Sequence, residues 1–142
     1  MYASQDDIIT LYGDAALVVA DRDGDGVPEA GAIARALTSA SAEIDASLAV
    51  RYTLPLATSH DILTQYCVDI ALYRLAGTSA MMTEELRVRF EDAMAALRRI
   101  ARGETRLSLP VDPDTPDGQT EANPIVQAGP ERIFSRDKMR GP

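Results

Sequence analysis

The sequence predicts an all-α protein, a small bundle of three or four main helices followed by an extended C-terminal arm. Apolar residues recur at three- and four-residue spacing along several stretches, as the buried face of a helix requires. Aromatic residues make up only 5% of the chain and Trp is absent, so the core must consist mainly of small and aliphatic side chains, which suit helices better than strands. Six of the eight prolines lie beyond residue 109, where they interrupt helices and interior strands.

The first expected element is a short helix that ends near Gly13. Ser4 and Asp7 form an S-x-x-D capping pattern directly before the apolar pair Ile8 and Ile9. Acidic residues in this first turn suit the positive end of the helix dipole. The pattern therefore predicts a capped helix that begins within the first few residues.

A second short turn and a loop are expected next. Asp14 is placed to cap a turn over residues 15–20, and residues 21–29 (DRDGDGVPE) have the composition of a loop. Pro28 suits the first turn of the helix that follows, because a helix does not use the N–H that proline lacks at that position.

The first long helix is expected over about residues 29–52. Small residues flank its apolar stripe, so a neighbouring helix can approach closely. Pro55 disfavours a helical conformation at Leu54, so the helix must end before it. The apolar stripe consists of Ile33, Leu37, Ala40, Ile44 and Leu48.

The second and third long helices are expected over about residues 60–76 and from Thr83 onwards. The second has Thr58 or Ser59 as its cap and Gly77 as its stop, and it is apolar over more than half its circumference, which predicts a central position. The third has acidic residues in its first turn and arginines in its last turns, as the helix dipole favours. It ends at Gly103, and its apolar stripe consists of Leu86, Phe90, Ala93, Met94, Leu97 and Ile100.

The chain is expected to divide into a helical body, residues 1–103, and an extended Pro-rich arm, residues 104–142. Leu107 and Leu109 alternate with polar residues, so a short β segment near residues 105–110 is an option. A segment that cannot bury its own apolar groups is disordered or folds onto a partner. We expect the arm to contact a neighbouring subunit or a partner protein; a tail without a partner is the alternative. The candidate contact residues are Ile125, Val126, Ile133, Phe134, Arg136, Lys138, Met139 and Arg140.

Composition and charge limit the classes of partner and compartment. The net charge of −8 disfavours nucleic-acid binding, which needs many Lys and Arg contacts to phosphate. A single cysteine allows no intrachain disulfide. The first ten residues lack the basic and apolar regions of a signal peptide, and no apolar run approaches the roughly 20 residues that span a bilayer. We expect a soluble product of the cytoplasm that has no membrane partner.

One loop carries a metal-binding pattern. Residues 21–26 match the first half of the calcium loop D-x-D-x-D-G, and Glu29 stands at its ninth position. The twelfth position, which should be a bidentate Glu, is Ala32. The favoured interpretation is therefore a polar turn whose aspartates accept backbone hydrogen bonds and whose glycines take positive φ. A calcium-binding helical interaction module stays as the alternative function, with Asp21, Asp23 and Asp25 as candidate ligands.

No residue pattern points to catalysis. His60 is the only histidine and is expected to be a solvated first-turn residue, while Cys67 lies on the apolar face of its helix and is expected to act as a small hydrophobe. The acidic residues of the third long helix alternate with arginines at i,i+4 spacing, which indicates surface ion pairs. We expect no enzymatic activity, no catalytic residue and no cofactor.

Several stretches of the chain resemble the Mu-type phage head–tail connector (adaptor) family, formerly catalogued as a domain of unknown function. The most specific is RY-x-LP-L directly after an A-x-x-EID helix. The resemblance covers nearly the whole chain. The matching stretches are YASQDDIITLYG (2–13), ALTSASAEIDASLAVRYTLPL (36–56), CVDIALYRL (67–75), RFEDAMAALRRIARGETRL (89–107) and IFSRDKMRG (133–141).

The resemblance implies a structural protein of the virion. It would be made in the bacterial host cytoplasm and would form a homo-oligomeric ring, twelve-fold by analogy with the family, at the head–tail junction. The ring would bind the portal protein on one side and receive the next neck or tail-completion protein on the other. DNA would pass through it without specific binding. The family provides no catalytic residue and no cofactor to expect here.

Overall fold

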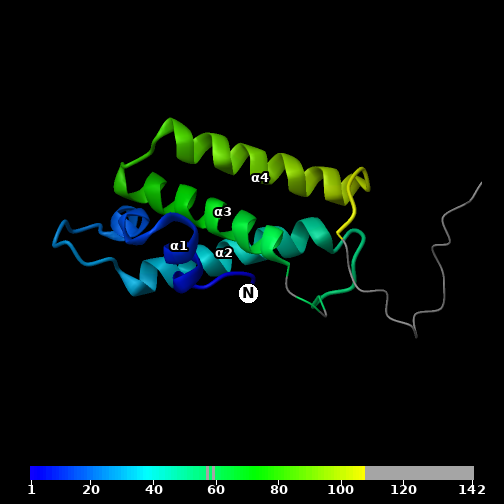
Figure 1. The fold of residues 1–142 in the computed structure, drawn as a ribbon, viewed down its shortest axis with the longest axis horizontal. Coiled ribbons are helices and arrows are strands. Elements are labelled where there is room, and N and C mark those ends of the chain that lie inside the picture. The colour runs from blue at the N-terminus through cyan, green and yellow to red at the C-terminus, as the bar shows by residue number, and fades with distance from the viewer. Residues whose placement is uncertain (57, 59, 108–142) are drawn as a thin grey trace, which may run out of the picture. The chain divides into compact units, whose positions relative to one another are not determined.

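The computed structural model describes residues 1–56, 58 and 60–107, and within them it contains helices and no strand (Figure 1). The predicted all-α fold is therefore confirmed. Residues 105–107 are not a strand, and the rest of the β segment considered above lies outside the described residues. The elements in order are α1 (Gln5–Tyr12), the 3-10 helix η1 (Asp14–Ala20), α2 (Ala30–Leu48), α3 (Asp61–Ser79) and α4 (Glu84–Arg102).

Helix α3 is the central element, as its broad apolar surface predicts. It packs against α1, η1, α2 and α4, and Figure 1 shows it between α2 and α4. Nine of its 19 residues are buried, and they lie on more than one side of the helix. The buried residues of α3 are Leu63, Cys67, Val68, Asp69, Ile70, Ala71, Leu72, Leu75 and Ala76.

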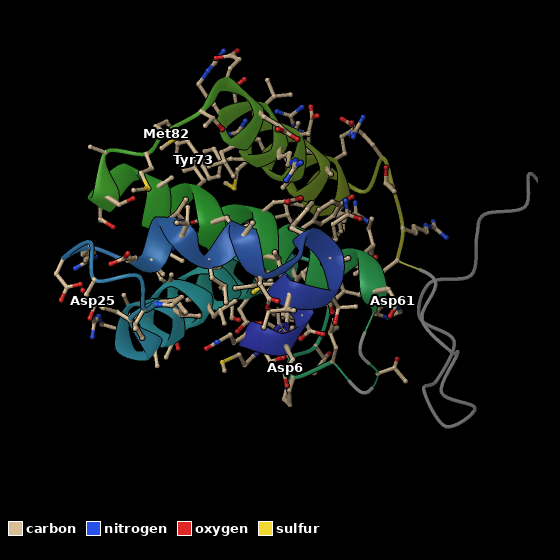
Figure 2. The ribbon with its side chains drawn as sticks, turned by 60° about the vertical axis from the view of Figure 1, so that its left-hand side comes forward. Asp6, Asp25, Asp61, Tyr73 and Met82 are labelled. Atoms are coloured by element: carbon tan, nitrogen blue, oxygen red, sulfur yellow. The ribbon has the colours of Figure 1, made fainter. Side chains whose placement is uncertain are left out.

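The two outer long helices each present one apolar stripe to α3. All five residues of the predicted α2 stripe are buried, and the small residues Ala36 and Ser41 beside it are buried too, which allows α2 and α3 to pack closely. In α4 the inner stripe residues Ala93, Leu97 and Ile100 are buried. Phe90 lies at the edge of that stripe and stacks on Tyr73 of α3, with ring centroids 4.1 Å apart (Figure 2).

The capping prediction for α1 is confirmed. The Ser4 hydroxyl accepts a hydrogen bond from the Asp7 N–H, and the Asp7 carboxylate accepts one from the Ser4 N–H at 2.7 Å. The hydrogen bonds from Ser4 hold the pKa of Asp7 below its usual value. Gly13 follows α1 with φ of 80°, a conformation that favours glycine.

Two predictions about the segment before α2 are wrong. Asp14 is the first residue of η1 and not its cap, since the capping position is Gly13 and no side chain bonds there. Pro28 lies before the N-cap Glu29 and so outside α2. Helix α2 also ends earlier than predicted, at Leu48, because the chain continues as a turn in which the N–H groups of Arg51 and Tyr52 donate to the Leu48 carbonyl.

The predicted ends of α3 need similar correction. His60 occupies the N-cap without a side-chain hydrogen bond, so Thr58 does not cap the helix, and Ser59 lies outside the described residues. The helix continues through Gly77 to Ser79 and ends where Ala80 takes φ of 58°. Glycine inside a helix costs only about 1 kcal/mol relative to alanine, so it does not by itself end one. The predicted boundaries of α4 are confirmed: Thr83 is the N-cap and Gly103 the C-cap.

The C-terminal end of α4 is tied to the segment that follows α2. The Arg51 guanidinium donates to the carbonyls of Ala101 and Arg102 at 3.2 and 3.3 Å. These carbonyls belong to the last turn of the helix, where they lack partners within it. The Tyr52 hydroxyl accepts a hydrogen bond from the Leu107 N–H at 3.0 Å. The chain therefore leaves the described bundle beside the C-terminal end of α2.

Candidate functional site

A first polar cluster anchors the N-terminal residues to α2 and α3. The Tyr2 hydroxyl donates to Asp45 at 2.6 Å and the Tyr2 N–H donates to the Ser41 hydroxyl at 3.2 Å. The Thr64 hydroxyl donates to the Tyr2 carbonyl at 2.9 Å. Burial, together with the bond to Asp45, raises the pKa of Tyr2. Each of these polar groups is therefore hydrogen-bonded to another segment of the chain.

A second polar cluster joins α1, α3 and α4. The Tyr12 hydroxyl donates to Asp69 at 2.6 Å, and Asp69 is only 4% exposed. Burial raises the pKa of this carboxyl, while the Tyr12 hydroxyl and the positive charge of Arg89 oppose the increase. Burial and the bond to Asp69 raise the pKa of Tyr12 to about 12. The Arg89 guanidinium lies 4.2 Å from the centre of the Tyr12 ring, a cation–π contact that completes the cluster.

The sequence did not predict these two clusters. Their partners are separated by 43 and 57 positions, so no local pattern could pair them. A partial signal did exist for the second cluster. Asp69 stands in the otherwise apolar run CVDIAL of the most buried helix, and a carboxyl in such a place needs a hydrogen-bond donor.

The Asp21–Asp25 loop is held by its own aspartates. Asp21 accepts hydrogen bonds from the N–H groups of Gly24 and Gly26 at 2.8 and 2.9 Å. Asp25 accepts one from the Val27 N–H at 2.7 Å, and both glycines have positive φ. These are the contacts of the polar turn that the sequence favours. Figure 2 shows Asp25 carried outward on this loop.

The three loop carboxylates could still share a cation. Ligand oxygens of Asp21, Asp23 and Asp25 lie within 4.8 Å of one another. Two features disfavour a calcium loop. Both Asp21 oxygens already accept backbone hydrogen bonds, and Ala32, at the twelfth position, is buried in α2 at 3% exposure.

A groove beside this loop combines apolar and acidic side chains. Its volume is about 410 Å³, and it lies between α1, η1 and the loop. Val18, one of its apolar lining residues, is 53% exposed. We call this feature the acidic groove, and its principal lining residues are Ile9, Asp14, Ala15, Val18, Asp21 and Pro28.

The acidic groove lies in the most negatively charged part of the described chain. Residues 1–29 contain seven acidic residues and one arginine, a formal charge of −6. Residues 30–107 contain nine acidic residues and nine arginines, so their charges balance. Several of these arginines form the predicted surface pairs on α4, including Arg87 with Glu84 and Glu91. The negative excess of the described residues therefore comes from the segment that forms the groove.

His60 and Cys67 differ in how well they match expectation. Cys67 is fully buried, and burial raises the pKa of its thiol, so its prediction as a small hydrophobe is confirmed. His60 was expected to be solvated, and this is wrong for its Nε2 atom, which is buried without a hydrogen-bond partner. His60 lines an open pocket of about 380 Å³ together with Tyr2 and Asp45. Among the described residues no nucleophilic side chain is hydrogen-bonded to the imidazole of His60.

The contact residues predicted for the arm, from Ile125 to Arg140, lie outside the described residues. Within the described helices, none is both long and apolar enough to cross a membrane.

In a comparison with known proteins, residues 2–126 match the family described as Bacteriophage Mu, Gp36. The Mu-like prophage FluMu protein gp36 of Haemophilus influenzae is 33% identical over 109 residues, which cover 77% of this chain and 74% of the relative. Gene product J of Escherichia phage Mu is 30% identical, with 99% of this chain and 97% of the relative covered. The similarity thus includes every described helix and continues beyond them.

Proposed function

This chain belongs to the phage Mu Gp36 family, and from that premise we propose that it is a structural virion protein, a ring-forming adaptor between the head portal and the neck of the tail. The observation that carries the proposal is the extent of the family match, which runs over residues 2–126. Four of the five stretches that resemble the Mu-type connector family lie within this match, and an adaptor ring is what that resemblance implies. The partners would be the portal protein, further copies of this chain and the next neck protein.

The use of the polar side chains supports a scaffold and not an enzyme. The Tyr2–Asp45 and Tyr12–Asp69 pairs both link separate segments of the bundle. They fix the positions of α1, α2 and α3 relative to one another. A structural protein that holds its neighbours in a defined arrangement needs such a rigid bundle. We therefore propose that the protein has no catalytic activity and no cofactor.

Exposed apolar side chains offer surface for contacts with other subunits. Val18, Val27, Val50 and Val88 are between 43% and 70% exposed. The first two lie on η1 and the loop after it, Val50 follows α2, and Val88 lies on α4. A subunit inside a ring touches a neighbour on each of two sides as well as its axial partners. Several separate contact regions are therefore what an adaptor needs.

Deleting the gene from the phage that encodes this chain tests the proposal. The expected result is that DNA-filled heads and free tails accumulate without joining, and that expression of the chain from a plasmid restores joined particles. Mass spectrometry of purified wild-type particles should also detect the protein. Normal particle yield after deletion, or absence of the protein from the particles, would contradict the adaptor role.

A calcium-binding module is the second candidate function, and it depends on the closeness of the three loop carboxylates. Titration of the full chain with millimolar calcium in a calorimeter tests it directly. Heat that disappears in the Asp23→Asn variant would support this candidate, and no heat would remove it. Asp23 is the appropriate residue to change because Asp21 and Asp25 accept the backbone hydrogen bonds that hold the loop.

A further inference from the structure

We propose that the acidic groove receives residues 131–141 of a second copy of this chain. These residues (ERIFSRDKMRG) are called the tip segment here. The pairing rests on the ring proposed above, and it specifies which two surfaces meet when one copy contacts the next.

Both apolar side chains and carboxylates line the groove. Ile9, Ala15 and Val18 line it, and Asp14 is an exposed residue beside them. Asp21 also lines it, although its oxygens already accept the two backbone hydrogen bonds of the loop. An occupant that matches this surface needs apolar side chains to displace water and cations to face the carboxylates.

The tip segment has that combination. It contains four cations against two carboxylates, a formal charge of +2, together with Ile133, Phe134 and Met139. Residues 108–130, which precede it, contain four acidic residues and no cation. Asp14 and Asp21 line the groove, and residues 1–29 as a whole carry −6, so this part of the chain attracts the tip segment and repels the segment before it. Charge therefore selects one part of the arm for this groove.

The position of the groove favours a second copy as the source of the tip segment. The loop that borders the groove ends at Glu29, the N-cap of α2, whereas Leu107 is bonded to Tyr52, just beyond the C-terminal end of α2. Helix α2 has 19 residues and is therefore about 28 Å long. Figure 1 shows the loop and the yellow segment that follows α4 near opposite ends of this helix. The chain thus leaves the described residues at one end of α2 while the groove lies at the other.

Such an arrangement suits head-to-tail assembly. A ring is built from two different surfaces, one of which meets the other on the next subunit, and the groove and the tip segment are two such surfaces. The 23 residues from 108 to 130 span at most about 80 Å when fully extended, which is enough to reach a neighbouring copy. The same length could reach the chain's own groove, so the experiment must distinguish the two cases.

Site-specific photocross-linking of the full chain makes that distinction. Isotope-labelled and unlabelled chains, each with p-benzoylphenylalanine in place of Phe134, are assembled together and irradiated. Mass spectrometry then assigns each cross-link to one chain or to two. The expected result is cross-links of mixed isotope composition between position 134 and residues 5–28. Cross-links only within one chain, or only to another surface, would overturn the proposal.

A substitution that reverses the charge of the groove tests the pairing, and a matched substitution elsewhere on the bundle provides the control. The Asp14→Lys, Val18→Lys variant should lower the yield of mixed-isotope cross-links about tenfold, because it places cations opposite the basic tip segment. The matched Val88→Lys variant, which changes an exposed valine on α4, should leave the yield unchanged. An unchanged yield in the groove variant would contradict the pairing.

Variants of the tip segment keep the test valid if the groove variant does not fold. Arg136→Glu with Lys138→Glu leaves the described bundle untouched and should cause the same tenfold loss. Combining it with Asp14→Lys should restore at least part of the yield, because the charges are then exchanged. Failure of the tip variant to reduce cross-linking would overturn the proposal.

The adaptor role and the pairing can fail independently. Tip variants that form normal rings and retain their cross-links contradict the pairing and leave the adaptor role intact. Absence of the protein from virions contradicts the adaptor role, while the cross-links between purified chains still report on the pairing.

Discussion

Removing the hydroxyl of Tyr12 tests the view that the polar clusters serve stability and not catalysis. In the Tyr12→Phe variant, Asp69 keeps its burial at 4% exposure and loses the donor that lies 2.6 Å away. A hydrogen bond to a buried charged group contributes about 2 kcal/mol. Because 1 kcal/mol shifts the melting temperature of a domain of this size by roughly 4 °C, we expect a decrease of about 8 °C at pH 7.

The same variant should show a characteristic pH dependence. Burial raises the folded-state pKa of Asp69 above 3.8, so its contribution to stability is greatest at low pH and is lost as pH rises through the folded-state pKa. The Tyr12 hydroxyl opposes that rise by stabilising the carboxylate. Without the hydroxyl the pKa rises further, and the free energy of unfolding should fall more steeply between pH 4 and 7 than in the wild type.

Thermal and urea unfolding followed by circular dichroism at pH 4 and 7 would measure both effects. Tyr73→Phe is the matched control: it removes a tyrosine hydroxyl but retains the ring stack on Phe90, and it should change stability by less than about 0.5 kcal/mol. Asp69→Asn should cost less in the Tyr12→Phe background than in the wild type, because it then removes a buried charge that has already lost its hydroxyl donor. Equal destabilisation by Tyr12→Phe and Tyr73→Phe, or no difference between the two pH values, would refute the reasoning.

Three further predictions concern other parts of the chain. Gly103→Ala should lower the free energy of unfolding by about 1–2 kcal/mol in a denaturant titration, since φ is 78° there and a Cβ would overlap the Arg51 guanidinium; an unchanged midpoint would contradict this. Deletion of residues 124–142 should leave the helical circular dichroism signal and melting temperature of the body within about 2 °C of wild type but abolish particle assembly; normal assembly by the truncated chain would refute it. Millimolar calcium should leave the melting temperature unchanged, because both oxygens of Asp21 are already engaged; a rise of several degrees that is absent in Asp23→Asn would favour the calcium module.

The helices could be predicted from the sequence because their signals are local. A stripe such as Ile33 to Leu48 defines a buried face through its spacing alone, whatever the helix packs against. The Ser4–Asp7 box and the Thr83 cap lie within one turn of the helices they start, so the residues that matter are adjacent in sequence.

Helix ends depended on contacts that the sequence does not reveal. Gly77 was predicted to stop α3, yet the chain there continues as helix, and Met82 folds back to lie beside it. The turn to the next element is made at Ala80, a residue type that rarely takes positive φ and so gives no signal in the sequence.

The candidate sites also differ in whether their contacts are local in sequence. The Asp21–Asp25 loop behaves as predicted because its hydrogen bonds join residues at most five positions apart. The Tyr12–Asp69 pair depends on packing between segments distant in sequence, whereas the acidic groove depends on how the consecutive segments α1, η1 and the loop pack together. In both cases only the charged or apolar members could be noticed in advance. The tip segment was predicted as a contact region, and that prediction awaits experiment.

A reconstruction of the purified particle by electron cryomicroscopy is the most direct test of the adaptor role. The account predicts a ring of density between portal and tail into which α2, α3 and α4 fit as a unit in every subunit. The acidic groove of each subunit should hold density continuous with the next one. A head–tail junction with no density that fits this helical bundle would contradict the central claim.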